Sequence, residues 1–450
     1  MHHTLKLLSG CLIAAFAATC ANAAITAEEA KALGTTLTPI GAEKAGNKDG
    51  TIPAYGGGLT SAPAGFKAGD GVRPDPFAGE KPRLVIDAKN MAQHADQLTE
   101  GTKALLQKYP SFRVDVYPTH RSVAFPKFVT ENTMKGAVNA KTLNDGRSIE
   151  GVHAAFPFPI PKTGNEAMWN HLVRFNGPSY EAKYRNLSVD ASGHATLATE
   201  GVSVQEFPYW DVSKPAAETF WRIKLTYTAP ARRAGEALMI VDPLDIGQKD
   251  RRAWSYLPGQ RRVKVAPDLA YDTPNPGTAG ATTFDDTFIF NGAMDRYDFK
   301  LVGKKEMLVP YNTYAAVYQA KQDDLLKPNH LNPDLVRWEL HRVWVVEATL
   351  REGKRHVYGK RTFYLDEDSW SALASDEYDG RGQLYRAGFA YMAPSYDLPA
   401  PYTDMFGHYD LVTRVYSLTG FIAETGGLRH TRALSEREWT ADSLAGAGIR

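Results

Sequence analysis

The sequence predicts a mostly β protein with a few helices, an α+β fold built on one large, curved antiparallel sheet. After about residue 185, short alternating segments separated by turn residues follow one another, which is typical of antiparallel strands. Helical spacing occurs mainly before that point. A sheet this large must cover its apolar face or curl around something, because that face is not stable in water.

Residues 1–23 are predicted to be a cleaved signal peptide. The apolar run 7–18 has the length of a signal-peptide core and is too short to span a bilayer. Ala21-Asn22-Ala23 has the small-x-small pattern of a signal peptidase site. Cys11 and Cys20, the only cysteines, leave with this segment. We therefore expect a soluble periplasmic protein without disulfides, thiol chemistry or cysteine-ligated metals.

A Gly/Pro-rich N-terminal arm, residues 24–86, is predicted to follow. Within residues 34–82, 11 Gly and 6 Pro occupy 17 of 49 positions, above the roughly 25–30% that is typical of irregular structure. The remaining chain, residues 87–450, is predicted to form a single large domain.

Three helices are expected in the first part of this domain. The first spans residues 88–109, because apolar residues recur there at spacings of three and four, with Asp87 as N-cap and Pro110 as its end. A second helix is expected from about residue 131 to 143. A third begins at the capping box Thr163-Gly164-Asn165-Glu166.

The strands are predicted from alternation and from the turns between them. Residues 112–116 form one early strand, and Pro258-Gly259 fits a type II turn inside a hairpin. The other expected strands are residues 220–228, 238–241, 254–257, 261–265, 284–290, 297–302, 337–351, 356–365 and 383–392.

Charge and motifs exclude several classes of function. Lys+Arg is 52 and Asp+Glu is 51, so nucleic acid is not expected as a partner. The sequence contains no phosphate loop, zinc-protease helix, EF-hand loop or Gly-x-Ser-x-Gly elbow. We therefore predict no cofactor and no metal site.

Aromatic residues are the first feature that points to a ligand. The chain has 22 Tyr, 19 Phe and 8 Trp, and many lie in predicted strands. They either fill a solid core or line a cavity for an apolar ligand, and pattern alone does not separate the two. The residues predicted to line a cavity are Trp254, Tyr256, Leu257, Phe288, Phe290 and Trp344.

Charged residues supply two further candidates. Arg252 and Arg262 lie in a basic hairpin, which either protects an exposed sheet edge or contacts an anionic headgroup or partner. Asp285 and Asp286 are adjacent carboxylates, which are common in solvated turns but can also serve a hydrolase.

Three segments carry a family resemblance. They are residues 33–43 (LGTTLTPIGAE), the stretch Phe156-Pro157-Phe158-Pro159 leading to Trp169-Asn170-His171, and residues 251–263 (RRAWSYLPGQRRV). They resemble a proteobacterial family of exported proteins of unknown function, related to the outer-membrane lipoprotein-sorting carriers. The resemblance implies a lipoprotein-carrier-like fold, a half-barrel closed by helices around an apolar cavity. It also implies a link to RND-type exporters, and it carries no established site residues.

The sequence therefore favours a periplasmic carrier or accessory protein for a lipid or other hydrophobic molecule, and not an enzyme. An RND-type inner-membrane exporter or an outer-membrane acceptor is the expected partner. Movement of a lid is needed for release, and the helix at 88–109 or the arm at 34–82 are the candidates. The alternatives are a periplasmic hydrolase that uses clustered carboxylates, and a docking module for an exporter that carries no ligand.

Overall fold

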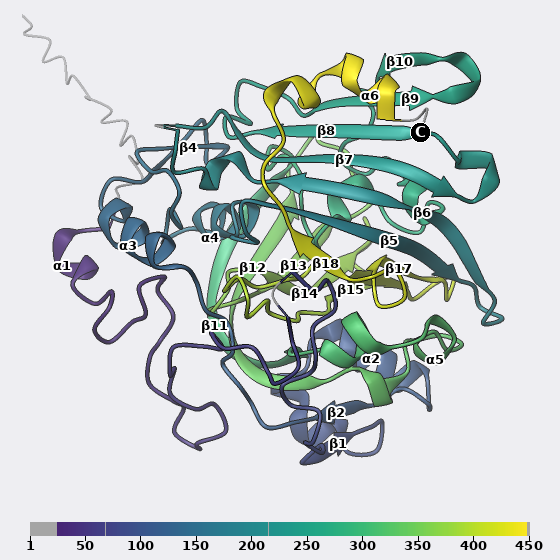
Figure 1. The fold of residues 1–450 in the computed structure, drawn as a ribbon. Helices are drawn as coiled ribbons and strands as arrows, with labels where there is room; N and C mark the ends of the chain where they lie inside the picture. The colour runs from purple at the N-terminus through teal and green to yellow at the C-terminus, as the bar shows by residue number, and fades with distance from the viewer. Residues whose placement is uncertain (1–24, 68, 215, 448–450) are drawn as a thin grey trace, which may run out of the picture.

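The structure is a computed structural model that describes residues 25–67, 69–214 and 216–447. The predicted signal peptide, residues 1–23, lies outside the described residues. One curled sheet dominates the molecule, with β5–β8 side by side in the upper half and β12–β15 crossing behind and below them (Figure 1).

Sixteen strands of the described chain form this sheet. They are β1 (Leu84–Ile86), β2 (Val114–Val116), β5 (Ser179–Val189), β6 (Ala195–Glu206), β7 (Thr219–Ala229), β8 (Ala237–Pro243), β9 (Arg252–Leu257), β10 (Arg262–Val265), β11 (Tyr297–Pro310), β12 (Trp338–Leu350), β13 (Lys360–Asp366), β14 (Ala372–Tyr378), β15 (Leu384–Ala390), β16 (Phe406–Asp410), β17 (Tyr416–Phe421) and β18 (Leu428–His430). A separate short hairpin joins β3 (Lys141–Leu143) to β4 (Ser148–Glu150).

The strand order runs β1-β2-β12-β13-β14-β15-β16-β17-β5-β6-β7-β8-β9-β10. Neighbours are antiparallel except β2 and β12, which are parallel through the pair Val116 and Trp338. β11 pairs with β12, and β18 pairs with β5, off this path. The path ends at β1 and β10, so the sheet is curved but does not close. This confirms the predicted mostly β fold with one large, curved, largely antiparallel sheet.

The C-terminal strand β17 joins the two halves of the sheet. It pairs with β16 on one side and with β5 on the other, although β5 precedes it by more than 200 residues. Local sequence patterns do not predict this pairing, because they indicate hairpins between strands that are neighbours in the chain. The continuous sheet therefore depends on a long-range contact.

Helices are few in the described chain, as predicted, and they are shorter than expected. They are α1 (Ala27–Ala30), α2 (Glu100–Lys108), α3 (Lys127–Gly136), α4 (Gly164–Leu172), α5 (Gln322–Leu325) and α6 (Ala441–Ala447). The predicted capping box opens α4, where the Glu166 amide donates to the Thr163 hydroxyl at 3.2 Å. The Glu166 carboxylate accepts from the Lys162 amide in place of the cap residue.

Two predicted helices have different boundaries. The expected helix 88–109 is broken into a 3-10 segment, η1 (Met91–Gln97), and α2, because Thr99 caps a new helix by accepting the Thr102 amide. The helix expected at 131–143 is α3, which begins earlier, and residues 141–143 form β3 instead.

Two predictions in the β region were also wrong. Residues 284–290 are not a strand: they form a 3-10 turn, η6 (Phe284–Asp286), followed by Phe288 and Ile289 with φ of 55° and 71°. Left-handed backbone cannot continue a strand. Between β9 and β10, a 3-10 turn places Arg261 at φ 48°, whereas a type II turn would place Gly259 at positive φ.

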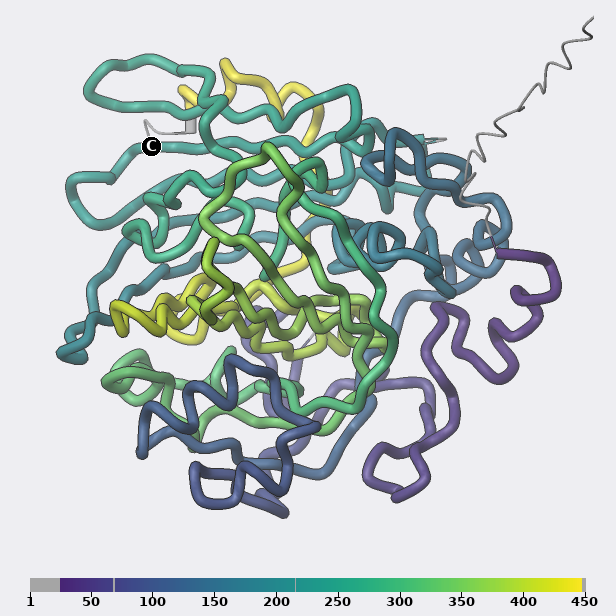
Figure 2. The backbone as a smooth tube through the Cα atoms, turned by 180° about the vertical axis from the view of Figure 1, so that it is seen from behind, coloured from purple at the N-terminus to yellow at the C-terminus, as the bar shows by residue number. Residues whose placement is uncertain are grey.

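The N-terminal arm packs along one side of the sheet (Figure 1, Figure 2). Between α1 and β1, its described residues form turns and isolated bridges. Arg73 anchors it: the fully buried guanidinium donates to Asp397 at 2.8 and 3.0 Å and to the Leu428 carbonyl at 3.1 Å. The irregular arm is thus tied to residues near the C-terminus.

We expect Gly101→Ala to destabilise the protein by about 1–3 kcal/mol through overpacking. A Cβ at this position of α2 would lie 2.4 Å from Ala387 Cβ and 2.8 Å from Asp376 Oδ1. Urea unfolding followed by circular dichroism measures the change. Gln107→Ala, on the exposed side of the same helix, is the control and should leave the unfolding midpoint nearly unchanged. A Gly101→Ala protein as stable as wild type would contradict this packing.

Candidate ligand cavity

The candidate site is a cavity of about 100 Å³ on the inner face of β5–β8. Successive side chains of a strand point to opposite faces, so every second residue reaches this cavity. Its lining residues on these strands are Tyr180, Ala182, Tyr184, Asn186, Ser203, Gln205, Trp221, Ile223, Leu225, Tyr227, Leu238 and Ile240. On β5, Glu181 and Lys183 alternate with these residues and are exposed on the other face.

A long connection between β10 and β11 covers the cavity, and its residues 266–291 are called the covering loop below. It contributes Asn275, Gly277, Phe284, Thr287 and Phe288 to the lining. The far wall comes from the C-terminal part of the sheet, through Tyr402, Asp404, Phe406, Thr419, Gly420 and Ile422. The cavity is therefore enclosed by segments that are distant in sequence.

Arg251 holds both ends of the covering loop against the sheet. Its guanidinium donates to both oxygens of Asp242 at 2.7 Å, to the Leu269 carbonyl at 3.3 Å and to the Asn291 carbonyl at 2.8 Å. Burial would lower the pKa of Arg251, but the Asp242 carboxylate outweighs it and raises this pKa. The guanidinium therefore stays charged and keeps the clamp closed.

The middle of the loop is held by the strands that it covers. The carbonyl of Gly277 accepts hydrogen bonds from the Asn186 side-chain amide at 3.2 Å and from the Thr199 hydroxyl at 3.0 Å. Asn186 also lines the cavity. Asn186 thus both forms part of the cavity wall and holds its cover in place.

Asp285 and Asp286 anchor the end of the covering loop through a buried group that we call the Arg361 cluster: Asp285, Asp286, His356, Tyr358 and Arg361. Arg361 donates to Asp285 at 3.2 Å and to Asp286 at 2.9 Å, His356 Nε2 lies 3.0 Å from Asp285, and the Tyr358 hydroxyl donates to Asp286 at 2.9 Å.

The electrostatics of the Arg361 cluster keep both aspartates charged. Burial alone would raise the pKa of Asp285, but the positive charge of Arg361 and the hydrogen bond from His356 outweigh it and hold that pKa well below its usual range. Asp285 and Asp286 are almost fully buried and neither lines the cavity. Their geometry is that of a structural ion pair.

One end of the cavity is polar. The buried Asp404 carboxylate accepts hydrogen bonds from the Tyr180 hydroxyl and, at 2.8 Å, from the Gln205 side chain. The Trp221 indole in turn donates to Gln205 at 2.9 Å. Burial raises the pKa of Asp404. The remaining lining is predominantly aliphatic and aromatic, which is typical of a site for an apolar ligand with a few orienting polar groups.

The six residues predicted to line a cavity lie in different parts of the structure. Phe288 lies in the cavity wall, where the Arg174 guanidinium stacks 4.3 Å from its ring centre. Phe290 instead packs in the core against Phe299 and Phe363. Trp344 stacks on Trp370 at 6.1 Å, away from the cavity.

Tyr256 and Leu257 border a second space of about 650 Å³ outside the cavity, which we call the outer groove. The outer groove and the cavity share the lining residues Tyr227, Leu238, Asn275 and Phe284. They are therefore adjacent, and Phe284 of the covering loop stands between them.

Trp254 and the two predicted arginines lie near the sheet edge. Trp254 packs near Trp439 of the C-terminal segment, together with Tyr256. Arg252 and Arg262 are both exposed on the β9–β10 hairpin, and Arg252 lies 5.8 Å from the Trp254 ring. None of the three lines the cavity.

The two segments predicted as lids do not border the cavity. Neither the 88–109 segment nor the arm at 34–82 contributes a lining residue, and α2 packs on β14 and β15. Sequence reasoning missed the covering loop, the clamp residue Arg251, and strands β5 and β6. For β5 a signal was present, because Tyr180, Ala182 and Tyr184 alternate with Glu181, Lys183 and Arg185.

We expect Arg361→Met to lower the free energy of unfolding by about 3–5 kcal/mol, because it leaves two buried carboxylates without their cation. Urea unfolding measures this loss, and limited proteolysis should show cleavage within residues 266–291. Arg351→Met is the matched control: Arg351 pairs with the exposed Asp298, so its loss should cost below about 1 kcal/mol. Equal stability of the two variants would contradict the anchoring role of Arg361.

Within the described residues, no helix is long and apolar enough to cross a membrane.

Comparison with known proteins places the chain in a family. Residues 85–445 match the family described as protein of unknown function DUF1329. The uncharacterized protein PA3922 of Pseudomonas aeruginosa is 40% identical over 458 residues, which cover 99% of this chain and all of that protein.

Two solved structures are similar at low identity. One is a domain from Vibrio parahaemolyticus that is described as an outer membrane lipoprotein-sorting protein domain. Its TM-score is 0.43 at 15% identity, and the match covers 62% of this chain and 97% of that one. A DUF1329 family protein from Desulfovibrio piger has a TM-score of 0.40 at 13% identity, over 60% and 92%. The family match covers most of this chain, which confirms the resemblance found in the sequence. This chain belongs to the DUF1329 family of proteins of unknown function.

Proposed function

We propose that this protein is a periplasmic carrier that binds a lipid or other hydrophobic molecule between β5–β8 and the covering loop. One observation carries the proposal. The inner face of four adjacent strands presents apolar side chains to a cavity that the protein's own core does not fill. Well-packed interiors leave few such spaces, so an apolar cavity under a loop is best explained by a ligand.

The size of the cavity indicates how a ligand would enter. An engineered apolar cavity of about 150 Å³ holds a benzene molecule, whereas this cavity measures about 100 Å³. A lipid chain therefore does not fit without displacement of the covering loop, or extension into the outer groove past Phe284. We propose that the described form is the closed one and that the covering loop is the lid.

The geometry favours binding over catalysis. Asp285 and Asp286, the carboxylates considered for a hydrolase, are buried in ion pairs and do not reach the cavity. A general acid or base must lie within hydrogen-bond reach of its substrate. We therefore propose no reaction for these residues, and assign them to holding the lid.

Arg252 and Arg262 support a proposed docking surface. Both are exposed on the hairpin at the end of the sheet, and exposed guanidiniums suit an anionic headgroup or an acidic partner surface. An RND-type exporter or an outer-membrane acceptor is the partner that we propose for this hairpin.

Ligand binding is tested with 1-N-phenylnaphthylamine, whose fluorescence rises in an apolar site, and with oleate as competitor. We expect wild-type protein to bind the probe at micromolar concentrations and oleate to displace it. Ala182→Phe, which fills the cavity from β5, should weaken binding at least tenfold. Native mass spectrometry before and after solvent extraction should show a lipid-sized mass that is lost on extraction.

Lys183→Leu is the matched control, because Lys183 is adjacent on β5 but exposed on the opposite face. It should bind the probe like wild type, and circular dichroism should show both variants folded. No probe binding by wild type, or equal binding by a folded Ala182→Phe protein, would count against a ligand in this cavity.

A further inference from the structure

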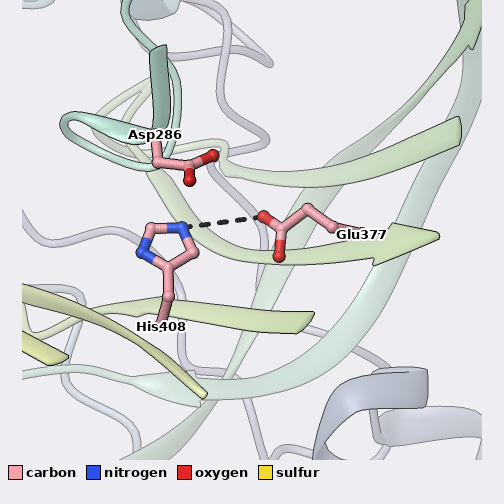
Figure 3. A group of neighbouring side chains, drawn as sticks. All are labelled: Asp286, Glu377 and His408. Atoms are coloured by element: carbon pink, nitrogen blue, oxygen red, sulfur yellow. Dashed lines mark ion pairs between the residues drawn. The ribbon is translucent and has the colours of Figure 1, made fainter. Parts of the chain in front are cut away.

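A second buried group lies outside the cavity, next to the Arg361 cluster, with which it shares Asp286. It consists of Asp286 in η6, Glu377 in β14 and His408 in β16, and Figure 3 shows the three side chains converging. One potential ligand atom from each lies within 4.8 Å of the others. All three residues are at most 1% exposed.

The strand register explains why Glu377 and His408 meet across an intervening strand. On β15, Arg386 pairs with Glu377 and Gly388 pairs with His408. A Cβ on Gly388 would lie 2.8 Å from His408 Nε2 and 2.4 Å from Ser375 Oγ. The glycine therefore leaves the space in which the His408 ring lies, and a larger residue would close it.

The hydrogen bonding of this group is incomplete. Both ring nitrogens of His408 and one carboxylate oxygen of Glu377, Oε2, have no hydrogen-bond partner although they are buried. His408 Nε2 and Glu377 Oε1 are 3.6 Å apart, too far for a hydrogen bond. Buried polar atoms are normally paired, and an unpaired one in a native protein calls for an explanation, such as a water or an ion that completes it.

Carboxyl groups also outnumber guanidinium groups in this part of the protein. Asp285, Asp286, Glu377 and Asp410 contribute four carboxylates, and the two guanidiniums among them are those of Arg361 and Arg386. His356 does not add a charge, because its Nδ1 accepts the Tyr358 amide at 3.1 Å while its Nε2 faces Asp285. Buried carboxylates require a compensating cation or a proton.

We propose that Asp286, Glu377 and His408 form a binding site for one divalent transition-metal cation. One imidazole nitrogen and two carboxylate oxygens form a ligand set that suits Zn²⁺. Bonds of about 2.0–2.2 Å place neighbouring ligand atoms roughly 3.3–3.6 Å apart in a tetrahedral site, and His408 and Glu377 already have this separation. The ligand atom of Asp286 lies within 4.8 Å of the other two, and a bound cation would draw the three atoms to this shorter separation.

Such a cation would have a structural role. Asp286 belongs to the covering loop, whereas Glu377 and His408 belong to the sheet, so the ion would join the two as Arg361 does. Because the site is buried, we expect the cation to enter during folding and not by exchange into the folded protein.

The test uses the full chain without an affinity tag, unfolded in urea with a chelator and refolded with Zn²⁺ alone. After desalting, metal analysis should find one zinc per chain, and the thermal unfolding midpoint should rise relative to protein refolded without metal. Less than 0.1 zinc per folded wild-type chain would overturn the proposal, and would indicate that a proton on the carboxylates completes the group.

Variants locate the cation. His408→Gln and Glu377→Gln should each reduce zinc content at least tenfold. His341→Gln is the control, because His341 belongs to a different buried group, with Asp366 and Asp368; it should retain one zinc. Loss of zinc in His341→Gln but not in His408→Gln would overturn the assignment. If the His408 variant does not fold, zinc K-edge absorption spectroscopy of the wild-type protein tests the site instead. A zinc coordination shell without an imidazole nitrogen would contradict the proposal.

Discussion

The ion pairs of Arg361 with Asp285 and Asp286 are the contact on which the cavity depends. The covering loop has no strand or long helix of its own to hold it, since its backbone passes through 3-10 turns and left-handed residues. Fixing such a segment costs conformational entropy, and the buried charges supply localised attraction at its end. Without them, the end of the loop that carries Phe284 and Phe288 would lose its strongest polar anchor.

The sheet and its cover therefore have different kinds of stability. The strands are stabilised by ladders of hydrogen bonds and by apolar burial, which are spread over many residues. The covering loop is stabilised at a few polar points: Arg251 with Asp242, Gly277 with Asn186 and Thr199, and Arg361 with the two aspartates. A segment held at discrete points can be released locally, while the sheet remains intact.

The sequence predicted the class of fold and most strands after residue 219, because period-two alternation and turn residues are local signals. The prediction failed where tertiary contacts, and not local patterns, determine the structure. Residues 284–290 have the aromatic content of a strand, but the ion pairs of Asp285 and Asp286 hold them in a loop. Arg251 directly precedes Arg252 of the basic hairpin in sequence, but Asp242, nine residues earlier, draws its side chain inward. Of the predicted cavity residues only Phe288 reaches the cavity, since alternation does not say which face of a strand is inward.

The tie between the arm and the C-terminal part of the chain constrains the order in which the molecule can assemble. Arg73 pairs with Asp397 and with the carbonyl of Leu428, across separations of 324 and 355 residues. During synthesis, the arm emerges first and its docking partners emerge last. It therefore has no binding surface until nearly the whole chain has emerged. The same applies to β5, which waits for β17. Contacts this distant slow folding, so the arm docks only in the last stage of folding.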